Sequence, residues 1–329
     1  MVLIENSVIE RVRGSAQRTV KGETHELTFH AMGTQCRVKF RVARTADAAA
    51  FQNEVLNWVG EFEATYSRFQ PDSPISRIND SAGLHWVETD SETQRIFALC
   101  DEAHFLTRGV FDPTALPLIR LWNWKATPPV IPEDEQISAA MQLVGWRKVQ
   151  RASGKIFLPL PGMSIDLGGI GKEYAVDRVA HLATQHGITS ALVDFGQDVF
   201  ALGIPMDGRP AWHIGLEDPK QPGKCWTGLA VRNQAVASSG DYLRRFEVNG
   251  KRYGHILDVR TGRPVANGCL AVSVIAPTCT LAGLYSTAAF VLGPDEGIKM
   301  LDATPNVNGC ITLEGKRTQT RRFYEHVVS

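Results

Sequence analysis

A lysine and three closely spaced glycines mark the start of a predicted helix. Residues 164–177 read SIDLGGIGKEYAVD, so Gly168, Gly169 and Gly171 precede Lys172. Glycines let backbone N–H groups approach an anion closely, the first turn of a helix favours negative charge, and the lysine adds a full positive charge. This pattern predicts a phosphate site.

The spacing fits neither of two familiar nucleotide motifs. A Walker loop needs a glycine five residues before Gly171 and a Ser or Thr after the lysine, whereas this chain has Asp166 and Glu173 there. The glycines are also spaced wrongly for a Rossmann turn. The sequence therefore indicates a different kind of phosphate site.

Four further clusters contain residues suited to a binding site, and each also has a structural interpretation. They are residues 29–34, 67–79 and 111–114, and the pair 239–242 and 254–264. Asp112, which precedes a proline, could form an Asx turn. His255 could be a hydrogen-bonded core residue, and Phe69 could pack in the core. A solvated position suits Lys172 less well, because a cation at a helix N-terminus is unfavourable unless an anion compensates.

Hydrophobic periodicity predicts the elements that must hold these clusters. Strands are expected over 24–42, with Met32 and Gly33 inside a strand as a bulge or a close approach to a ligand. Helices are expected over 45–66 and 91–108, shortly before Gly145, after Gly171 and over about 280–292, with a loop over 70–83. Asn249-Gly250 predicts a hairpin turn. This mixture indicates an α+β fold.

Composition limits the possible partners and setting. The 329 residues are 43% hydrophobic, and 35 Lys and Arg balance 35 Asp and Glu, so nucleic acid is not expected as a partner. The six cysteines form no C-x-x-C pair, which argues against a zinc ribbon. Residues 1–22 lack the apolar run of a signal peptide, and no stretch approaches the ~20 apolar residues of a membrane span. A cytoplasmic protein is expected.

Taken together and in order, the clusters resemble the FAD:protein FMN transferase family, also called the ApbE family. The resemblance spans about residues 28–293. It is carried by MGT at 32–34, FDPT at 111–114, DLGGIGK at 166–172, GHILD at 254–258 with TG at 261–262, and STA at 286–288.

The resemblance implies a two-lobed α+β fold in which FAD lies in a cleft between the lobes. The lobes would be interleaved within residues 23–329, after an N-terminal extension over 1–22. The implied reaction cleaves the FAD pyrophosphate with a divalent metal, usually Mg²⁺. FMN passes as a phosphoester to a Ser or Thr hydroxyl of an acceptor flavoprotein, and AMP leaves.

The resemblance also implies roles for particular residues. The flavin or adenine pocket would be lined by Met32, Phe69, Phe111 and Asp112, and the nucleotide and pyrophosphate would be held by Asp166 and Lys172. His255 and Ile256 would lie beside the flavin end. The metal would be bound by the Gly169 carbonyl and Thr287. His255, with a reference pKa near 6.5, is expected to accept the proton of the attacking hydroxyl.

This chain departs from the family pattern at two positions. The family normally has an Asp four residues before the Thr of Ser-Thr-Ala, where this chain has Gly283, so a weakened magnesium site is expected. Gly283→Asp would then tighten metal binding. The family commonly has Gly after the lysine, where this chain has Glu173, which either replaces the lost charge or is a solvated first-turn glutamate.

Three functions remain compatible with these departures. The first is an active transferase with a rebuilt metal site, the second a non-catalytic FAD-binding carrier or regulator, and the third a metal-dependent pyrophosphatase that releases FMN and AMP from FAD. The presence of Lys172, His255 and Thr287 together favours the transferase, because a protein that only binds FAD has less use for all three. Asp198 is expected to be structural.

Overall fold

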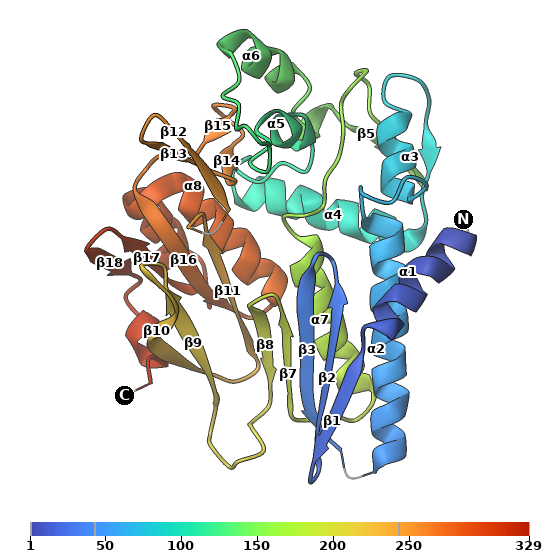
Figure 1. Cartoon of the computed structure of the whole chain (residues 1–329), viewed down its shortest axis with the longest axis vertical. Helices are drawn as coiled ribbons and strands as arrows, with labels where there is room; N and C mark the ends of the chain where they lie inside the picture. Colours follow the sequence, from blue (N-terminus) through green and yellow to red (C-terminus); the bar gives the residue numbers. More distant parts are fainter. Residues whose placement is uncertain (1, 43, 243, 329) are drawn as a thin grey trace.

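A nine-stranded antiparallel sheet forms the centre of the protein (Figure 1). The computed structural model describes residues 2–42, 44–242 and 244–328. In spatial order the strands are β1 (Gln17–Lys21), β2 (Thr24–Ala31), β3 (Thr34–Arg41), β7 (Ala191–Phe195), β8 (Asp198–Leu202), β11 (Gln234–Gly240), β16 (Cys269–Ala276), β17 (Asn308–Leu313) and β18 (Lys316–Gln319).

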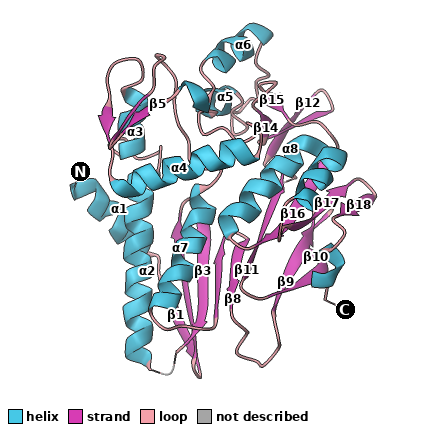
Figure 2. Ribbon diagram, turned by 180° about the vertical axis from the view of Figure 1, so that it is seen from behind, coloured by secondary structure: helices cyan, strands magenta, loops and turns pink. Residues whose placement is uncertain are grey.

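Helices cover one face of this sheet (Figure 2). They are α1 (Val2–Gly14), α2 (Thr45–Tyr66), α7 (Gly171–Gln185) and α8 (Cys279–Ala303), each packed against the next. Apolar side chains alternate along the strands and meet the helices in a large core that includes Phe29, Phe40, Phe51 and Phe290. This core fixes α7 and α8 side by side.

A hairpin covers the opposite face near the C-terminal strands. It is formed by β9 (Trp212–Asp218) and β10 (Gln221–Val231), and η2 (Phe323–His326) lies beside β10. Apolar residues of the hairpin pack on Val236, Ile275 and Cys310. The residues adjacent to these three in each strand point to the other face of the sheet, toward the helices. Both faces of β11, β16 and β17 are therefore buried.

The remaining elements lie above the sheet in Figure 1 and form an upper layer. They are α3 (Pro74–Asp80), β4 (Val87–Glu88), α4 (Ser91–Leu106), α5 (Leu116–Leu121), α6 (Asp134–Gln142), η1 (Trp146–Lys148), β5 (Gln150–Ala152), β6 (Lys155–Phe157), β12 (Arg245–Val248), β13 (Lys251–Gly254), β14 (Leu257–Asp258) and β15 (Arg263–Pro264). Within the described ranges, no helix has the length and apolar character needed to cross a membrane.

The α+β prediction is confirmed, and the helix over 45–66 and the Asn249-Gly250 hairpin lie where the sequence places them. The prediction that Met32 and Gly33 lie inside a strand is wrong. They form the turn between β2 and β3, with φ of 51° and 71°. A tight hairpin turn requires this left-handed backbone.

One helix lies in a predicted loop, and another is longer than predicted. The loop predicted over 70–83 contains α3, because Ser73 caps it by accepting a hydrogen bond from the Ser76 N–H and Pro74 begins it. Helix α8 continues beyond 292 to Ala303, with a break at Gly293, where φ is 83°.

The N-terminal segment is attached to the body of the protein. Val8 and Val12 are buried, α1 packs on α2, and β1 pairs with β2. The extension predicted over 1–22 is therefore, over its described residues 2–22, a helix and a strand that belong to the same layers as the rest of the chain.

A buried carboxylate on α7 holds the start of α8. Asp177 accepts hydrogen bonds from the backbone N–H groups of Cys279 and Thr280 at 2.7 and 2.9 Å, and from the Thr280 hydroxyl at 2.7 Å. The N–H groups of a first helical turn have no partner within the helix, so Asp177 satisfies two of them. Burial raises the pKa of Asp177, against the lowering effect of these hydrogen bonds.

We expect Asp177→Ala to lower the free energy of unfolding by about 2–3 kcal/mol, because the buried donors at the start of α8 lose their acceptor. Urea unfolding followed by circular dichroism measures this change. Asp47→Ala is the matched control: Asp47 lies in the first turn of α2 but pairs with Arg44 at the surface, so its loss should cost less than about 1 kcal/mol. Equal effects of the two variants would contradict the capping role.

Candidate functional site

Three segments converge on the chain just before the glycine-rich turn. The side chain of Asn79 on α3 bonds both the N–H and the carbonyl of Ile165, at 2.6 and 3.0 Å. The Asp166 N–H donates to the Pro113 carbonyl at 2.8 Å, and Arg68 Nε donates to Asp166 Oδ2 at 3.0 Å. Segments 68–69, 111–114 and 165–169 are thereby held together.

The aromatic residues predicted for the nucleotide pocket lie at this junction. A Cβ added to Gly169 would come within 3.1 Å of Phe111 Cε2, so the ring lies directly against the glycine turn. Phe69 is 75% exposed, with the Arg68 guanidinium 4.2 Å from its ring centroid. A large exposed aromatic beside a charged residue suits stacking on a planar ligand.

Asp112 is engaged within the protein. Its Oδ1 accepts from the N–H and hydroxyl of Thr114 at 2.8 and 2.5 Å, and its Oδ2 accepts from the Trp146 N–H at 2.9 Å. Its side chain is 5% exposed. Asp112 therefore holds the turn that presents Phe111, in the Asx-turn arrangement that was its structural alternative.

Lys172 lies between two carboxylates at the start of α7. Its Nζ forms an ion pair with Asp198 at the start of β8 and lies 3.5 Å from Glu173 Oε1. The N-cap position, Ile170, provides no side-chain hydrogen bond to the helix. The lysine and this uncapped helix end lie at the turn for which the sequence predicts a phosphate site.

Glu173 fills the space beside Gly283. A Cβ added at Gly283 would lie 2.6 Å from Glu173 Cγ, so the two positions share one volume. Gly283→Asp alone would therefore require Glu173 to move, which corrects the expectation that this change simply adds a ligand. Glu173 is 8% exposed, and its Oε2 has no hydrogen-bond partner among the described residues.

Three hydroxyls meet where α8 crosses the end of β11. Ser239 Oγ lies 2.9 Å from Thr287 Oγ1 and 2.8 Å from Ser286 Oγ. Ser286 also donates to the Gly283 carbonyl at 2.9 Å. Thr287 lies four residues after Gly283, on the same side of α8. The hydroxyl of Thr287 is thus on the helix face that Glu173 contacts.

His255 and Ile256 enter from the upper layer, between β13 and β14. The His255 N–H donates to the Arg244 carbonyl at 3.0 Å, and the Trp124 ring is 6.4 Å from the imidazole. Burial, followed by the positive charge of Arg244, lowers the pKa of His255 to about 4. Its Nδ1 is buried and has no partner within the described ranges. Ile256 packs on Val110 and Ala288, which flank Phe111 and Thr287.

Met32 lies in the turn at one end of strands β2 and β3. Its N–H donates to Glu63 Oε2 on α2 at 2.9 Å. The β2–β3 turn lies next to the β7–β8 turn, where a Cβ at Gly196 would overlap Thr34. Because Asp198 follows that turn, Met32 is placed near the residue that pairs with Lys172.

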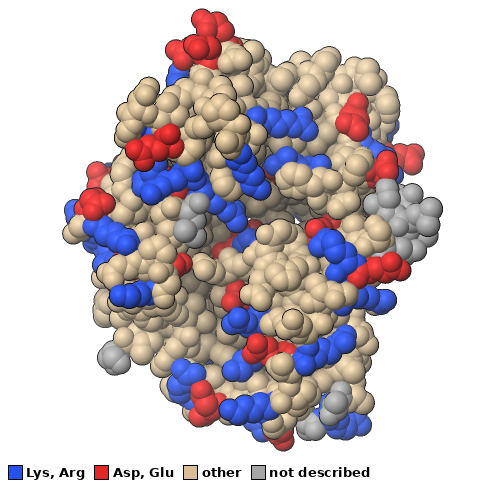
Figure 3. All heavy atoms as spheres, in the orientation of Figure 1, with Lys and Arg blue, Asp and Glu red and all other residues tan. Residues whose placement is uncertain are grey.

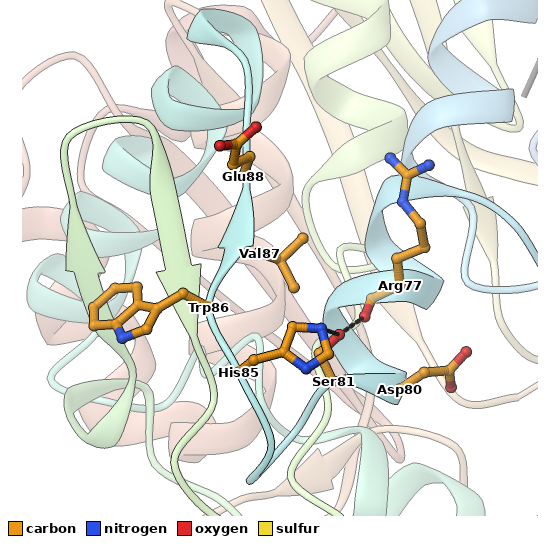
Figure 4. Close-up of a pocket in the computed structure, with 7 residues that line it drawn as sticks. All are labelled: Arg77, Asp80, Ser81, His85, Trp86, Val87 and Glu88. Atoms are coloured by element: carbon orange, nitrogen blue, oxygen red, sulfur yellow. Dashed lines mark hydrogen bonds between the residues drawn. The ribbon is translucent and has the colours of Figure 1, made fainter.

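These contacts lie between the upper layer and the sheet. Figure 3 shows a hollow at about this level of the molecule, with Lys and Arg side chains along its upper side. A separate open pocket lies at α3 and β4 (Figure 4), and the predicted site residues are not among the residues that line it. The lining residues are Arg77, Asp80, Ser81, His85, Trp86, Val87 and Glu88.

Sequence reasoning missed three contributors to this site. Arg68 fixes Asp166, Ser239 contacts Thr287, and Asp198, which was expected to be structural, pairs with Lys172. Arg68 and Ser239 lie in segments that the sequence singled out as polar clusters, so that signal was present. Nothing local in the sequence identifies Asp198 as the partner of a lysine 26 positions before it.

Comparison with known proteins identifies the family of this chain. The ApbE family model matches residues 32–311. A curated FAD:protein FMN transferase of Treponema pallidum is 33% identical over 88% of this chain and 84% of its own length. The ApbE protein of Thermotoga maritima superposes with a TM-score of 0.84 at 31% identity, over 93% of this chain and all of that one. The flavin transferase ApbE of Vibrio cholerae gives 0.82 at 26%, over 94% and 99%. The chain belongs to the ApbE family.

Proposed function

We propose that this protein is an FAD:protein FMN transferase. The observation that carries the proposal is the glycine turn at the start of α7, where Gly169 lies against Phe111 and is followed by Lys172 and an uncapped helix end. That arrangement suits a diphosphate joined to flat ring systems. Relatives that span most of this chain carry the same activity in their names.

In this proposal the residues divide into three groups around FAD. Met32, Phe69 and Phe111 line the ring pockets, with Asp112 positioning Phe111. Lys172 and the glycine turn bind the diphosphate, and Asp166 holds the turn through its bond to the Gly168 N–H at 3.0 Å. His255 and Ile256 lie at the flavin end.

The proposed reaction transfers the FMN moiety of FAD by substitution at its phosphorus. A Ser or Thr hydroxyl of an acceptor flavoprotein attacks the FMN phosphorus, a new P–O bond forms, and the bond to the AMP oxygen breaks. AMP leaves with the electron pair, and the hydroxyl proton passes to the neutral imidazole of His255. Lys172 and the turn amides stabilise the charge on the phosphate oxygens.

The site suits magnesium as the metal. Its donors are oxygens, namely the Gly169 carbonyl, the Thr287 hydroxyl and a buried carboxylate oxygen of Glu173 that has no partner among the described residues. The described residues contain no group of three or more His, Cys, Asp or Glu side chains arranged to hold a metal. Mg²⁺ commonly binds through one or two carboxylates, waters and substrate phosphates, and it would neutralise diphosphate charge.

A cytoplasmic acceptor protein is part of the same proposal. All six cysteines are unpaired thiols, and five of them are buried. Unpaired cysteines are usual in a reducing compartment.

The function is tested with purified protein, FAD, Mg²⁺ and a candidate acceptor that carries a Ser or Thr flavinylation motif. We expect a fluorescent, covalently flavinylated acceptor and one AMP per flavin transferred. Free FMN with AMP would instead identify a pyrophosphatase. Tight FAD binding without turnover would identify a carrier or regulator, and either result would overturn the proposal.

We expect Lys172→Gln to raise the Kd for FAD about 10- to 100-fold, because a charge-assisted hydrogen bond contributes about 1.5–3 kcal/mol. Flavin fluorescence titration without metal measures the change. Since Asp198 would lose its partner, the variant Lys172→Gln/Asp198→Asn keeps the pair neutral and should bind FAD equally weakly. Lys299→Gln, at an exposed pair with Glu296, is the control. Unchanged affinity in both Lys172 variants would remove the lysine from the diphosphate site.

His255→Gln should slow single-turnover transfer by about 10²-fold or more. A base acts only when unprotonated, and the pKa of His255 in the free protein is about 4. The His255-dependent part of kcat/KM for FAD should therefore stay level from pH 8 to about pH 5 and fall only below that range. An inflection of kcat/KM near pH 6.5 that disappears in His255→Gln would contradict the lowered pKa of buried His255. Normal single-turnover transfer by His255→Gln would contradict the role of His255 as the base.

A further inference from the structure

The buried charges at the start of α7 do not balance. Lys172 contributes one positive charge, whereas Asp198 and Glu173 contribute two negative charges within reach of its ammonium group. Asp198 is 6% and Glu173 8% exposed. A buried excess of negative charge is costly unless a cation compensates it.

The unpaired part of that charge is located on Glu173. Lys172 is held by Asp198 and reaches Glu173 only through Oε1, at 3.5 Å. Oε2 is buried and has no hydrogen-bond partner in the described part of the chain. A buried carboxylate oxygen with a free lone pair is the kind of donor that a hard divalent cation takes.

Helix packing places this side chain against α8, the helix that carries Ser286 and Thr287. Glu173 lies against Gly283, and Thr287 follows one turn later on the same side of α8. A larger residue at 283 would exclude the glutamate, since the Cβ alone would lie 2.6 Å from its Cγ. Because residue 283 is a glycine, the Glu173 side chain on α7 can pack against the surface of α8.

We propose that Glu173 is the charged magnesium ligand of this protein, and that positions 173 and 283 form an exchangeable pair in which one carboxylate serves the same metal from either helix. This inference rests on the proposed function, because it assigns a ligand in the same site.

The test is Mn²⁺ affinity, measured from the loss of the free-ion EPR signal with FAD-loaded protein and no acceptor. Glu173→Gln keeps the size of the side chain and removes its charge, and it should weaken Mn²⁺ binding at least tenfold. The reciprocal exchange Glu173→Gly/Gly283→Asp should restore Mn²⁺ affinity to within about threefold.

Two further variants separate this effect from general disturbance of the helices. Gly283→Asp alone should not tighten Mn²⁺ binding, because its side chain competes with Glu173 for one volume. Glu92→Gln is the matched control. Glu92, on α4, accepts a hydrogen bond at 3.2 Å from the hydroxyl of Tyr174, which follows Glu173 on α7. The control variant should leave Mn²⁺ affinity unchanged.

The outcomes distinguish this inference from the proposed function. Wild-type Mn²⁺ affinity in Glu173→Gln, with FAD-dependent transfer intact, would overturn the ligand assignment and leave the transferase standing. Failure of the double exchange to recover Mn²⁺ binding in a folded protein would overturn the exchangeable pair. Absence of FAD binding and transfer in the wild-type protein would overturn the proposed function itself.

Discussion

The antiparallel crossing of α7 and α8 is the constraint on which the site depends. Asp177 satisfies the first N–H groups of α8, and one turn earlier on α7 Glu173 lies against Gly283. The two contacts run in opposite directions along the helices, so they fix both the spacing and the register of the crossing. Thr287 is consequently presented where β11 ends, next to Ser239.

Around this crossing, the upper layer supplies the groups that the two helices lack. Phe111 lies against Gly169, Arg68 holds Asp166, and Ile256 packs beside α8. Each of these residues belongs to a segment far away in the sequence, so the site is assembled from several short segments rather than from one continuous element. Ile165 and Leu167, on either side of Asp166, belong to the same apolar core as the sheet residues.

Much of the fold could be predicted from local patterns, whereas the chemistry of the site depends on contacts between distant segments. Helical periodicity identified α2, and Asn249-Gly250 identified a hairpin, because both signals are contained within a few residues. Helix α3 was missed since seven residues are too few for a period to emerge. The lowered pKa of His255 and the contact between Glu173 and Gly283 arise from packing, so no window of sequence contains them.

The shared volume at positions 173 and 283 also constrains how such a site changes over generations. A chain that carried side chains at both positions would be overcrowded, and one that carried glycine at both would lack the carboxylate. A lineage that moves the acidic group from one helix to the other must therefore pass through one of these two impaired combinations. Under the proposed ligand assignment, the effect of a substitution at either position therefore depends on the residue at the other.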